Sequence, residues 1–141
     1  EAMILGLAIA RGDDAWEAQI VACAHRLAKV LEVKDGEEML SLWDARHQDF
    51  HAAIAAGCGS QHLLQARAAL FDQAERYRHL WLQQTVFSPA ALEAKRQEHA
   101  TLVEVILQRD SARACAMMQA HLLSPVSIIG ELLQARQNRV E

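Results

Sequence analysis

The chain has 141 residues, of which 52% are hydrophobic and 23% charged, and its 18 acidic residues outnumber its 14 basic ones to give a net charge of −4 with neutral histidines. This composition is that of one ordinary globular domain. The acidic balance without a basic cluster makes the chain a poor candidate for direct contact with DNA, and no apolar run approaches the ~18 residues of a membrane span.

The cysteines indicate a reducing environment. They stand at positions 23, 58 and 115, among small and mostly apolar neighbours, and form no CxxC motif. An odd number at this spacing favours free, buried or half-buried thiols over disulfides or a redox site. We therefore expect a cytoplasmic protein.

The apolar periodicity is helical along nearly the whole chain. It predicts helices over residues 1–10, 13–34, 37–56, 61–86, 88–109, 110–123 and from 124 onward. The first of these breaks near Gly12, and because the chain begins inside it without a methionine, we expect a fragment of a longer protein.

Capping residues support the later helix boundaries. Asp13 or Asp14 can cap the second helix, Ser88 before Pro89 opens the fifth, and Asp110 can cap the sixth. A second Ser-Pro pair, at residues 124–125, predicts a separate last helix. Because the connections are short and no stretch alternates like a strand, we expect one all-α domain over residues 1–141, an antiparallel bundle of six to seven helices.

Two histidines lie four residues apart in the stretch HQDFH. On the helix expected over 37–56, the apolar stripe consists of Leu40, Trp43, Phe50 and Ile54. His47 and His51 fall inside this stripe. Residues at this spacing are ~5–6 Å apart at Cβ, so that two imidazoles can share one ion with metal–nitrogen distances of about 2.0–2.1 Å.

Two further histidines, His99 and His121, also occupy positions where their helices require apolar residues. A single histidine of this kind is more often a hydrogen-bonded core residue than a metal ligand. Four imidazoles buried without partners, however, would each cost about 1–3 kcal/mol, and a shared ion would satisfy one nitrogen on every ring. Spacing alone leaves a central metal site and a set of core histidines as equal alternatives.

The residues around the histidine pair argue against catalysis. Zinc peptidases with an HExxH motif use its glutamate as general base, and this position is Gln48 here. Asp49 points to another face of the helix. The predicted site is therefore one that holds a ligand without turning it over, and we expect no enzyme.

Three motifs in this order resemble a known family. They are F-H-x-A-I-x-x-x-x-G-S from Phe50, E-H-x-x-L-x-x-x-I-x-x-R-D-x-x-x-A from Glu98, and M-x-x-H-L from Met118. Over residues 14–123 the chain resembles the C-terminal effector-binding (FCD) domain of the FadR subfamily of GntR transcription regulators. The resemblance implies an antiparallel all-helical bundle that holds a divalent metal through Asp-x-x-x-His and two later histidines.

Carried over by position, the resemblance gives His51, His99 and His121 as metal ligands. The aspartate position falls on His47, which departs from the family pattern and completes an all-nitrogen set. Such a set suits transition metals better than Mn or Mg, and we expect Zn or Ni.

The resemblance also implies partners for the domain. It predicts the ligand-sensing part of a bacterial transcription regulator, a repressor and homodimer, that contacts DNA only through an N-terminal winged-helix domain absent from this chain. The stretches SLWDARHQDFHAAIAAGCGS and RYRHLW are similar to members that respond to glutarate. We therefore expect a small carboxylate effector, a five-carbon dicarboxylate such as glutarate, and no membrane partner.

Arginines on the fourth expected helix are candidates for the far end of such an effector. Arg67 and Arg78 share one face of that helix, and a guanidinium meets a carboxylate through two parallel hydrogen bonds. Arg46, beside the histidine pair, is a third candidate. The alternative is that the two arginines are surface residues paired with Asp72 or Glu75.

Two other functions stay open at this level. The first is a helical-bundle metalloenzyme of the DinB kind, with three histidines and an open metal position. The second is a structural or interaction module whose histidines belong to the core.

Overall fold

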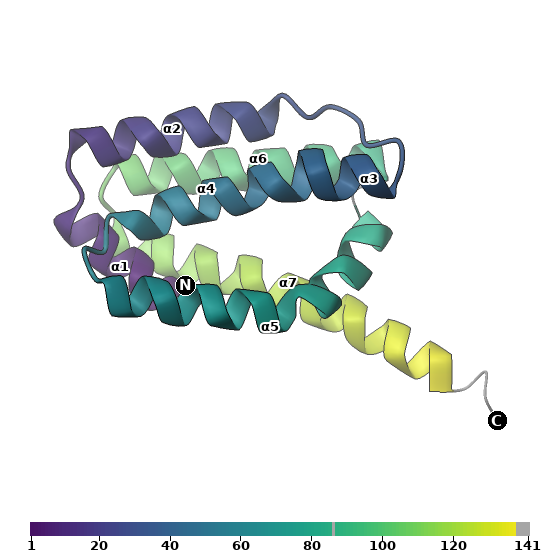
Figure 1. The fold of residues 1–141 in the computed structure, drawn as a ribbon. Helices are drawn as coiled ribbons and strands as arrows, with labels where there is room; N and C mark the ends of the chain where they lie inside the picture. Colours follow the sequence, from purple (N-terminus) through teal and green to yellow (C-terminus); the bar gives the residue numbers. More distant parts are fainter. Residues whose placement is uncertain (86, 138–141) are drawn as a thin grey trace.

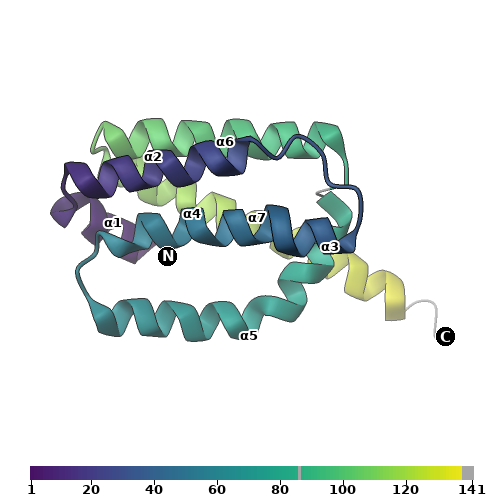
Figure 2. The ribbon, with the colours of Figure 1, turned by 45° about the horizontal axis from the view of Figure 1, so that its top comes forward.

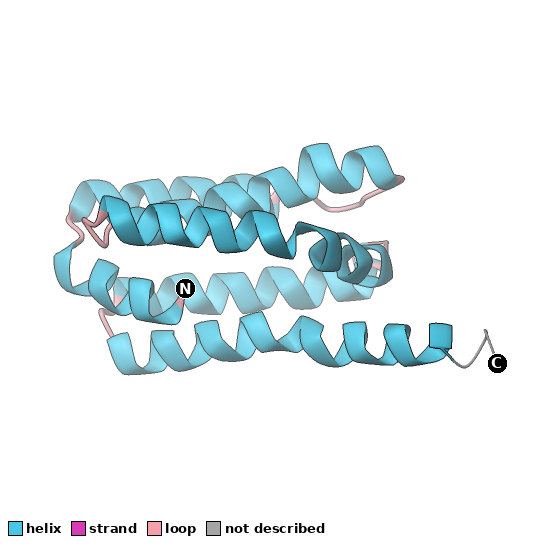
Figure 3. Cartoon of the chain, turned by 60° about the horizontal axis from the view of Figure 1, so that its bottom comes forward, coloured by secondary structure: helices cyan, strands magenta, loops and turns pink. Residues whose placement is uncertain are grey.

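The computed structural model describes residues 1–85 and 87–137, and all of its regular structure is helical (Figure 3). The elements are α1 (Ala2–Arg11), α2 (Asp14–Ala28), α3 (Gly36–Glu38), the π-helical segment η1 (Met39–Asp44), α4 (Ala45–Ala56), α5 (Gln61–Thr85), α6 (Pro89–Leu107) and α7 (Ser111–Gln137). This confirms the predicted all-α class. Residue 86, the expected end of the fourth helix, lies outside the described residues. Within them, no helix is long and apolar enough to cross a membrane.

The helix starts follow the predicted caps. Asp13 accepts a hydrogen bond from the backbone N–H of Trp16 at 2.9 Å, and Asp35 caps α3 in the same way. Ser88 caps α6 with Pro89 directly behind it, and Asp110 accepts from the first turn of α7. These side chains satisfy N–H groups that would otherwise have no partner at a helix start.

Long helices run antiparallel to one another along one common direction (Figure 1). In that view α2, α5 and α7 run one way, whereas α4 and α6 return. Turned by 45°, α6, α2, α4 and α5 follow one another across the molecule with α7 behind them (Figure 2). Helix α2 packs on α4 and α6, and α7 packs on α1, α5 and α6. The predicted antiparallel bundle is therefore confirmed.

Trp16 holds one end of the bundle together. Its indole N–H donates to the carbonyls of Ala53 and Ile54 on α4 at 3.0 and 3.1 Å. A Cβ atom at Gly12 or Gly57 would come within 2.1 and 2.6 Å of the indole. These two glycines are therefore required by the close approach of the backbone to a buried aromatic ring.

The interior is apolar except at its centre. Its largest fully buried side chains include Phe50, Leu5, Ile20 and Leu102. Among the described residues, the buried polar side chains are one aspartate and four histidines: Asp44, His47, His51, His99 and His121. The core thus encloses a small polar region, which is costly unless its members bind to one another or to a ligand.

The helix predicted over 37–56 is helical throughout, but its first part is wound differently. Residues 39–44 form a π-helix, which carries more residues per turn than an α-helix. Leu40, predicted on the buried stripe, is 42% exposed, and Met39 is buried in its place. The wider turn moves the apolar face by one residue, which an α-helical repeat does not anticipate.

The predicted break at 124–125 is wrong, because α7 continues through Pro125 to Gln137. Proline has no N–H, so it cannot donate to the carbonyl of His121 one turn earlier. The hydroxyl of Ser124 donates to that carbonyl instead, at 2.8 Å. The side chain of one residue thus replaces the backbone donor that its neighbour lacks.

Candidate metal centre

The four histidines predicted as a cluster come together in the middle of the bundle. His47 and His51 lie on α4, His99 on α6 and His121 on α7. Each is 4–7% exposed, and each offers a ring nitrogen that lies within 4.8 Å of those of the other three. The cluster therefore joins three helices that are distant in sequence.

The spacing of the ring nitrogens fits a shared ion. Nε2 of His47 and Nε2 of His51 are 3.1 Å apart. Two neighbouring ligands at about 2.0–2.1 Å from one ion are ~2.9–3.4 Å apart for octahedral to tetrahedral angles. Nε2 of His99 is buried without a hydrogen-bond partner in the described part of the chain, as are Nδ1 of His47 and Nδ1 of His121. An ion bound to the Nε2 atoms of His47 and His51 would also give Nε2 of His99 a partner, so the donor set fits the metal that the sequence predicts.

Aromatic packing fixes the orientation of the imidazoles. The indole of Trp43 stacks on His47 with ring centroids 4.6 Å apart and an interplanar angle of 21°. Phe50 meets His51 and His99 edge-on, with centroids 5.5 and 5.3 Å away. Rings held in this way lose little further freedom when they bind a ligand.

The environment disfavours the protonated form of three of the histidines, His47, His51 and His99. Burial lowers the pKa of His47 well below its usual range, and the neighbouring histidines lower it further. The pKa values of His51 and His99 are lowered mainly by the same loss of hydration. Neutral imidazole is the form that binds metals, so the fold presents the rings in the right protonation state.

Two carboxylates reach the outer side of the cluster. Oε1 of Glu98 lies 3.0 Å from Nδ1 of His121, and Oε2 of Glu1 lies 3.8 Å from Nδ1 of His51. Contact with His121 lowers the pKa of Glu98 to about 2 against the opposing effect of burial, and Lys95 contributes. Burial would raise the pKa of Glu1, but His51 and Arg67 together lower it. Both carboxylates are therefore ionised near neutral pH.

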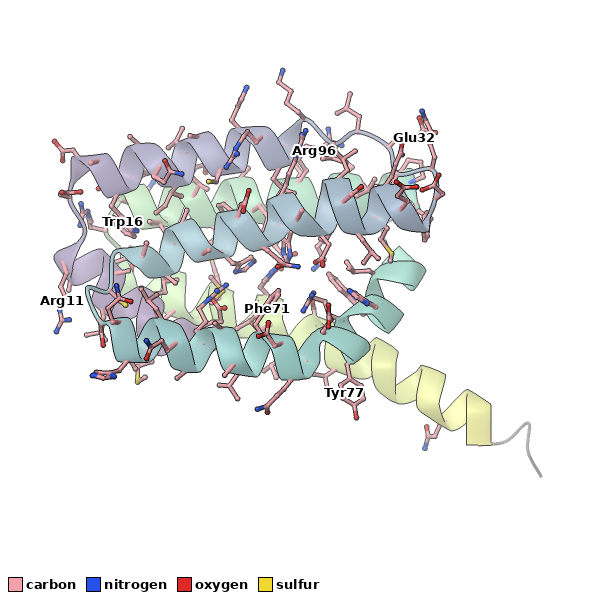
Figure 4. All side chains as sticks on the ribbon, in the orientation of Figure 1. Arg11, Trp16, Glu32, Phe71, Tyr77 and Arg96 are labelled. Carbon is pink, nitrogen blue, oxygen red and sulfur yellow. The ribbon has the colours of Figure 1, made fainter. Side chains whose placement is uncertain are left out.

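A cavity of about 230 Å³ opens beside the cluster, between α4, α5 and α7. Its residues are Glu1, His47, His51, Phe71, Ala74, Tyr77, Arg78, Trp81, His121, Leu122 and Val126. Figure 4 shows Phe71 on the side of α5 that faces the bundle and Tyr77 on its outer side. At about 30 Å³ per water molecule, the cavity has room for several waters or one small organic molecule.

Arg78 lies in the wall of this cavity and is not a surface residue. Its side chain is 12% exposed, and its Nε lies 3.2 Å from Oδ1 of buried Asp44. The guanidinium also stacks on Phe71, 3.9 Å from the ring centroid. Pairing with Asp72 or Glu75, the alternative that the sequence left open, is therefore wrong for this arginine.

Arg67 is also largely buried, but it lies one step further from the histidines. Its Nε is 2.6 Å from Oε1 of Glu1, and the side chain is 12% exposed. It lines an adjoining cavity of about 310 Å³ that shares Glu1, Phe71 and Leu122 with the first. Arg67 therefore pairs with Glu1 and not with Asp72 or Glu75, the acidic residues expected on its own helix.

Arg46 is not brought to the cavity. Its guanidinium donates to the backbone carbonyl of Arg26 on α2 at 2.7 Å, on the side of α4 that packs against α2. The side chain of Arg46 is not part of the cavity wall. Of the three predicted arginines, only Arg78 shares a cavity with the histidines.

The acidic residues that contact Arg78 and His121 were not predicted from the sequence. Asp44 lies three residues before His47, and Glu98 immediately precedes His99. Glu98 was visible as part of a motif, and its spacing from Lys95 is that of a helical ion pair. The burial of Asp44 carried no comparable signal, because it depends on the π-helical winding of η1.

Comparison with known proteins assigns the chain to a protein family. The model of the family described as "FCD domain" matches residues 1–124. The chain is 53% identical over 133 residues to the HTH-type transcriptional repressor GlaR of Escherichia coli strain K12, covering 94% of the chain and 60% of that protein. It is 29% identical over 131 residues to the uncharacterized HTH-type transcriptional regulator BphR of Paraburkholderia xenovorans strain LB400, covering 92% and 52%. The chain thus spans a little more than half of these relatives. No solved structure matches it.

Proposed function

This chain belongs to the FCD domain family, and on that premise we propose that it is the ligand-sensing domain of a transcription repressor. In this proposal it binds a small carboxylate at a divalent metal held by His47, His51, His99 and His121. The observation that carries it is the convergence of four buried imidazoles beside a cavity that also contains a guanidinium.

The donor set favours Zn or Ni. Imidazole nitrogen suits these ions better than Mn or Mg, which prefer oxygen ligands. When bound, such an ion supplies a Lewis-acid position for one carboxylate oxygen, because Ni accepts six ligands and Zn can expand beyond four. The remaining binding steps depend on the residues of the cavity.

Arg78 is arranged to hold a second carboxylate. Its Nε and Nη2 donate to Asp44 at 3.2 and 3.3 Å, and its Nη1 donates to the carbonyl of Phe71 at 3.4 Å. A guanidinium has five N–H groups, so one N–H on each terminal nitrogen is left over. These two form the edge that binds a carboxylate through two parallel hydrogen bonds.

A cation at each end and apolar walls between them select a short dicarboxylate. Phe71, Ala74 and Leu122 offer carbon surface to a methylene chain. The size of the cavity suits a small metabolite, and we propose a five-carbon dicarboxylate such as glutarate. Arg67 in the adjoining cavity adds positive charge near the entrance, whereas Arg46 has no part in this arrangement.

The rest of the regulator follows from the relatives. Both are named as HTH-type regulators, and this chain spans about half of their length. We propose that an N-terminal winged-helix domain binds DNA, that the protein acts in the cytoplasm as a homodimer, and that effector binding shifts the populations of two helix arrangements.

A DinB-like metalloenzyme is less well supported. Gln48 occupies the position of a general base and donates to Asp44 at 2.8 Å. Glu98, which contacts His121, has a pKa of about 2 and is therefore too weak a base to take a proton near pH 7, and the pKa of Glu1 beside His51 is lowered as well. Both relatives are named as regulators.

The first test is elemental analysis of the chain purified without chelator or affinity metal. We expect about one Zn or Ni per chain, followed by calorimetric binding of glutarate that EDTA abolishes. A chain without metal after incubation with both ions would refute the proposed centre. Consumption of glutarate during the titration would favour the enzyme.

A further inference from the structure

His121 differs from the other three histidines in the way its side chain is held. Nδ1 lies 3.0 Å from Oε1 of Glu98 on α6. Lys95, one turn earlier on the same helix, lies 2.7 Å from Oε2 of that carboxylate. The two oxygens of Glu98 thus lie close to Nδ1 of His121 and to Nζ of Lys95, and the contact with Nδ1 is close in distance without being aligned as a hydrogen bond.

No comparable contact holds the other rings among the described residues. His51 has Glu1 at the longer distance of 3.8 Å, whereas neither His47 nor His99 has an ion-pair contact with a carboxylate. Their orientation depends on packing against aromatic rings instead. Among the described residues, a carboxylate as close as 3.0 Å is therefore specific to His121.

The backbone of His121 is also linked to Lys95, through the hydroxyl of Ser124. Its carbonyl, which has lost the N–H of Pro125, accepts from the hydroxyl of Ser124 at 2.8 Å. Nζ of Lys95 donates to that hydroxyl at 3.3 Å. Lys95 and Glu98 therefore hold both the ring and the main chain of His121 from the neighbouring helix.

We propose that Glu98 is a positioning residue of the proposed metal centre and that it fixes the tautomer of His121. With an oxygen 3.0 Å from Nδ1, the ionised carboxylate favours the tautomer that carries the proton on this nitrogen, which leaves the lone pair on Nε2 for a divalent transition metal. It also makes the imidazole a stronger donor. This inference rests on the proposed function, since it assigns Glu98 a role toward the same metal.

The test compares Zn²⁺ affinity among three forms of the chain by competition with a chromophoric chelator. Glu98→Gln keeps the size of the side chain but removes its charge, and we expect about 10–100-fold weaker binding. Glu93→Gln is the matched control, because Glu93 lies on the same helix, is 50% exposed and pairs with Arg96 at 3.0 Å. Its affinity should equal that of the unmodified chain.

A second measurement needs no metal. Nitrogen-15 NMR of the metal-free chain reports which ring nitrogen of each histidine carries the proton. We expect His121 to be protonated on Nδ1 in the unmodified chain and in Glu93→Gln, and to populate both tautomers in Glu98→Gln.

The two readouts separate the possible failures. Equal affinity of Glu98→Gln and the unmodified chain would overturn the positioning role, as would an Nε2-protonated His121 in the unmodified metal-free chain. If no form binds Zn²⁺ or Ni²⁺, the proposed function fails, and the inference about a metal fails with it. If all three forms bind and only Glu98→Gln is weakened, both proposals are supported.

Discussion

His47 stands where the family resemblance predicts an aspartate as metal ligand. Its Nε2 lies 3.1 Å from that of His51, so the departure keeps a donor atom where a carboxylate oxygen is expected. An imidazole in place of a carboxylate removes one negative charge, and a bound divalent ion keeps more of its own charge. This favours an anionic ligand and a softer metal.

Replacing this histidine should change metal preference. We predict that His47→Asp binds Mn²⁺ about ten-fold or more better relative to Zn²⁺ than the unmodified chain does, because oxygen donors suit harder ions. Competitive loading followed by elemental analysis measures the ratio. His62→Asp, at an exposed position of α5, is the control and should leave it unchanged. An identical metal profile for His47→Asp would show that residue 47 is not a ligand.

Arg78 is the residue on which selection of a dicarboxylate should depend. We predict that Arg78→Lys weakens glutarate binding by about ten-fold or more, because an ammonium group lacks the planar edge that meets a carboxylate. Binding of butyrate, which has a single carboxylate for the metal, should change little. Isothermal calorimetry gives both affinities on Zn-loaded protein. Equal losses for the two ligands would place Arg78 in a structural role through Asp44.

The histidine positions were predictable because an apolar helix face makes a polar residue conspicuous. His47, His51, His99 and His121 each interrupt such a face, and all four are buried. The partners Asp44 and Glu1 were not predictable in this way. They meet Arg78 and Arg67 across the bundle, and a contact between distant helices leaves no periodic signal in one sequence.

At the scale of whole elements, helix starts followed local chemistry, whereas one helix end and the winding did not. Asp13, Ser88 and Asp110 cap helices as predicted, because a cap is a contact within four residues. The second helix, predicted to reach residue 34, ends at Ala28, and the π-helical winding of η1 was not predicted. The continuation of α7 through Pro125 was missed because a Ser-Pro pair is typical of a helix start, whereas here the hydroxyl of Ser124 donates to the carbonyl of His121.

Arg109, in the turn between α6 and α7, contacts α1, α2 and the turn between them. Arg109 has a φ of 58°, in the left-handed region. Its guanidinium donates to the carbonyls of Ile9 and Gly12 at 2.7 and 2.9 Å and pairs with Glu17 at 2.6 Å. The turn between α1 and α2 is thereby held to the turn between α6 and α7.

Two substitutions separate the backbone and side-chain effects at Arg109. We predict that Arg109→Ala lowers the free energy of unfolding by about 2 kcal/mol, mainly through the two lost hydrogen bonds, since the partly exposed ion pair adds little. Arg109→Gly should lose about 1 kcal/mol less, because glycine adopts positive φ without strain. Urea denaturation measures both, with exposed Arg113→Ala as control. Equal values for alanine and glycine would contradict a backbone cost at this turn.

Across the whole molecule, the bundle surrounds a set of neutral imidazoles with apolar side chains. Three helices contribute to the cluster, so its burial depends on the complete fold. In the unfolded chain the same histidines are hydrated and bind protons near pH 6.5. Folding and protonation therefore compete at the centre of the domain.

This competition predicts how stability depends on pH in the metal-free chain. Burial lowers the folded-state pKa values of His47, His51 and His99, so below about pH 6.5 the unfolded state binds protons that the folded state does not. Stability should therefore be full above this pH and fall as the pH decreases toward the folded-state values. Glu98, with a folded-state pKa of about 2, should add a further loss below its unfolded value of 4.5. Urea denaturation between about pH 7.5 and 4.5 measures the slope.

The slope, rather than the absolute stability, identifies the groups responsible. His99→Gln removes one of the three histidines whose pKa is lowered and should make the dependence below about pH 6.5 shallower, whatever it does to stability at neutral pH. His62→Gln removes an exposed histidine and should leave the slope unchanged. Zn²⁺ should be released over the same range, because protons and metal compete for the same lone pairs. A metal-free chain equally stable at about pH 7.5 and 5 would mean that the histidines bind protons as readily in the folded as in the unfolded state, contrary to the effect of their burial.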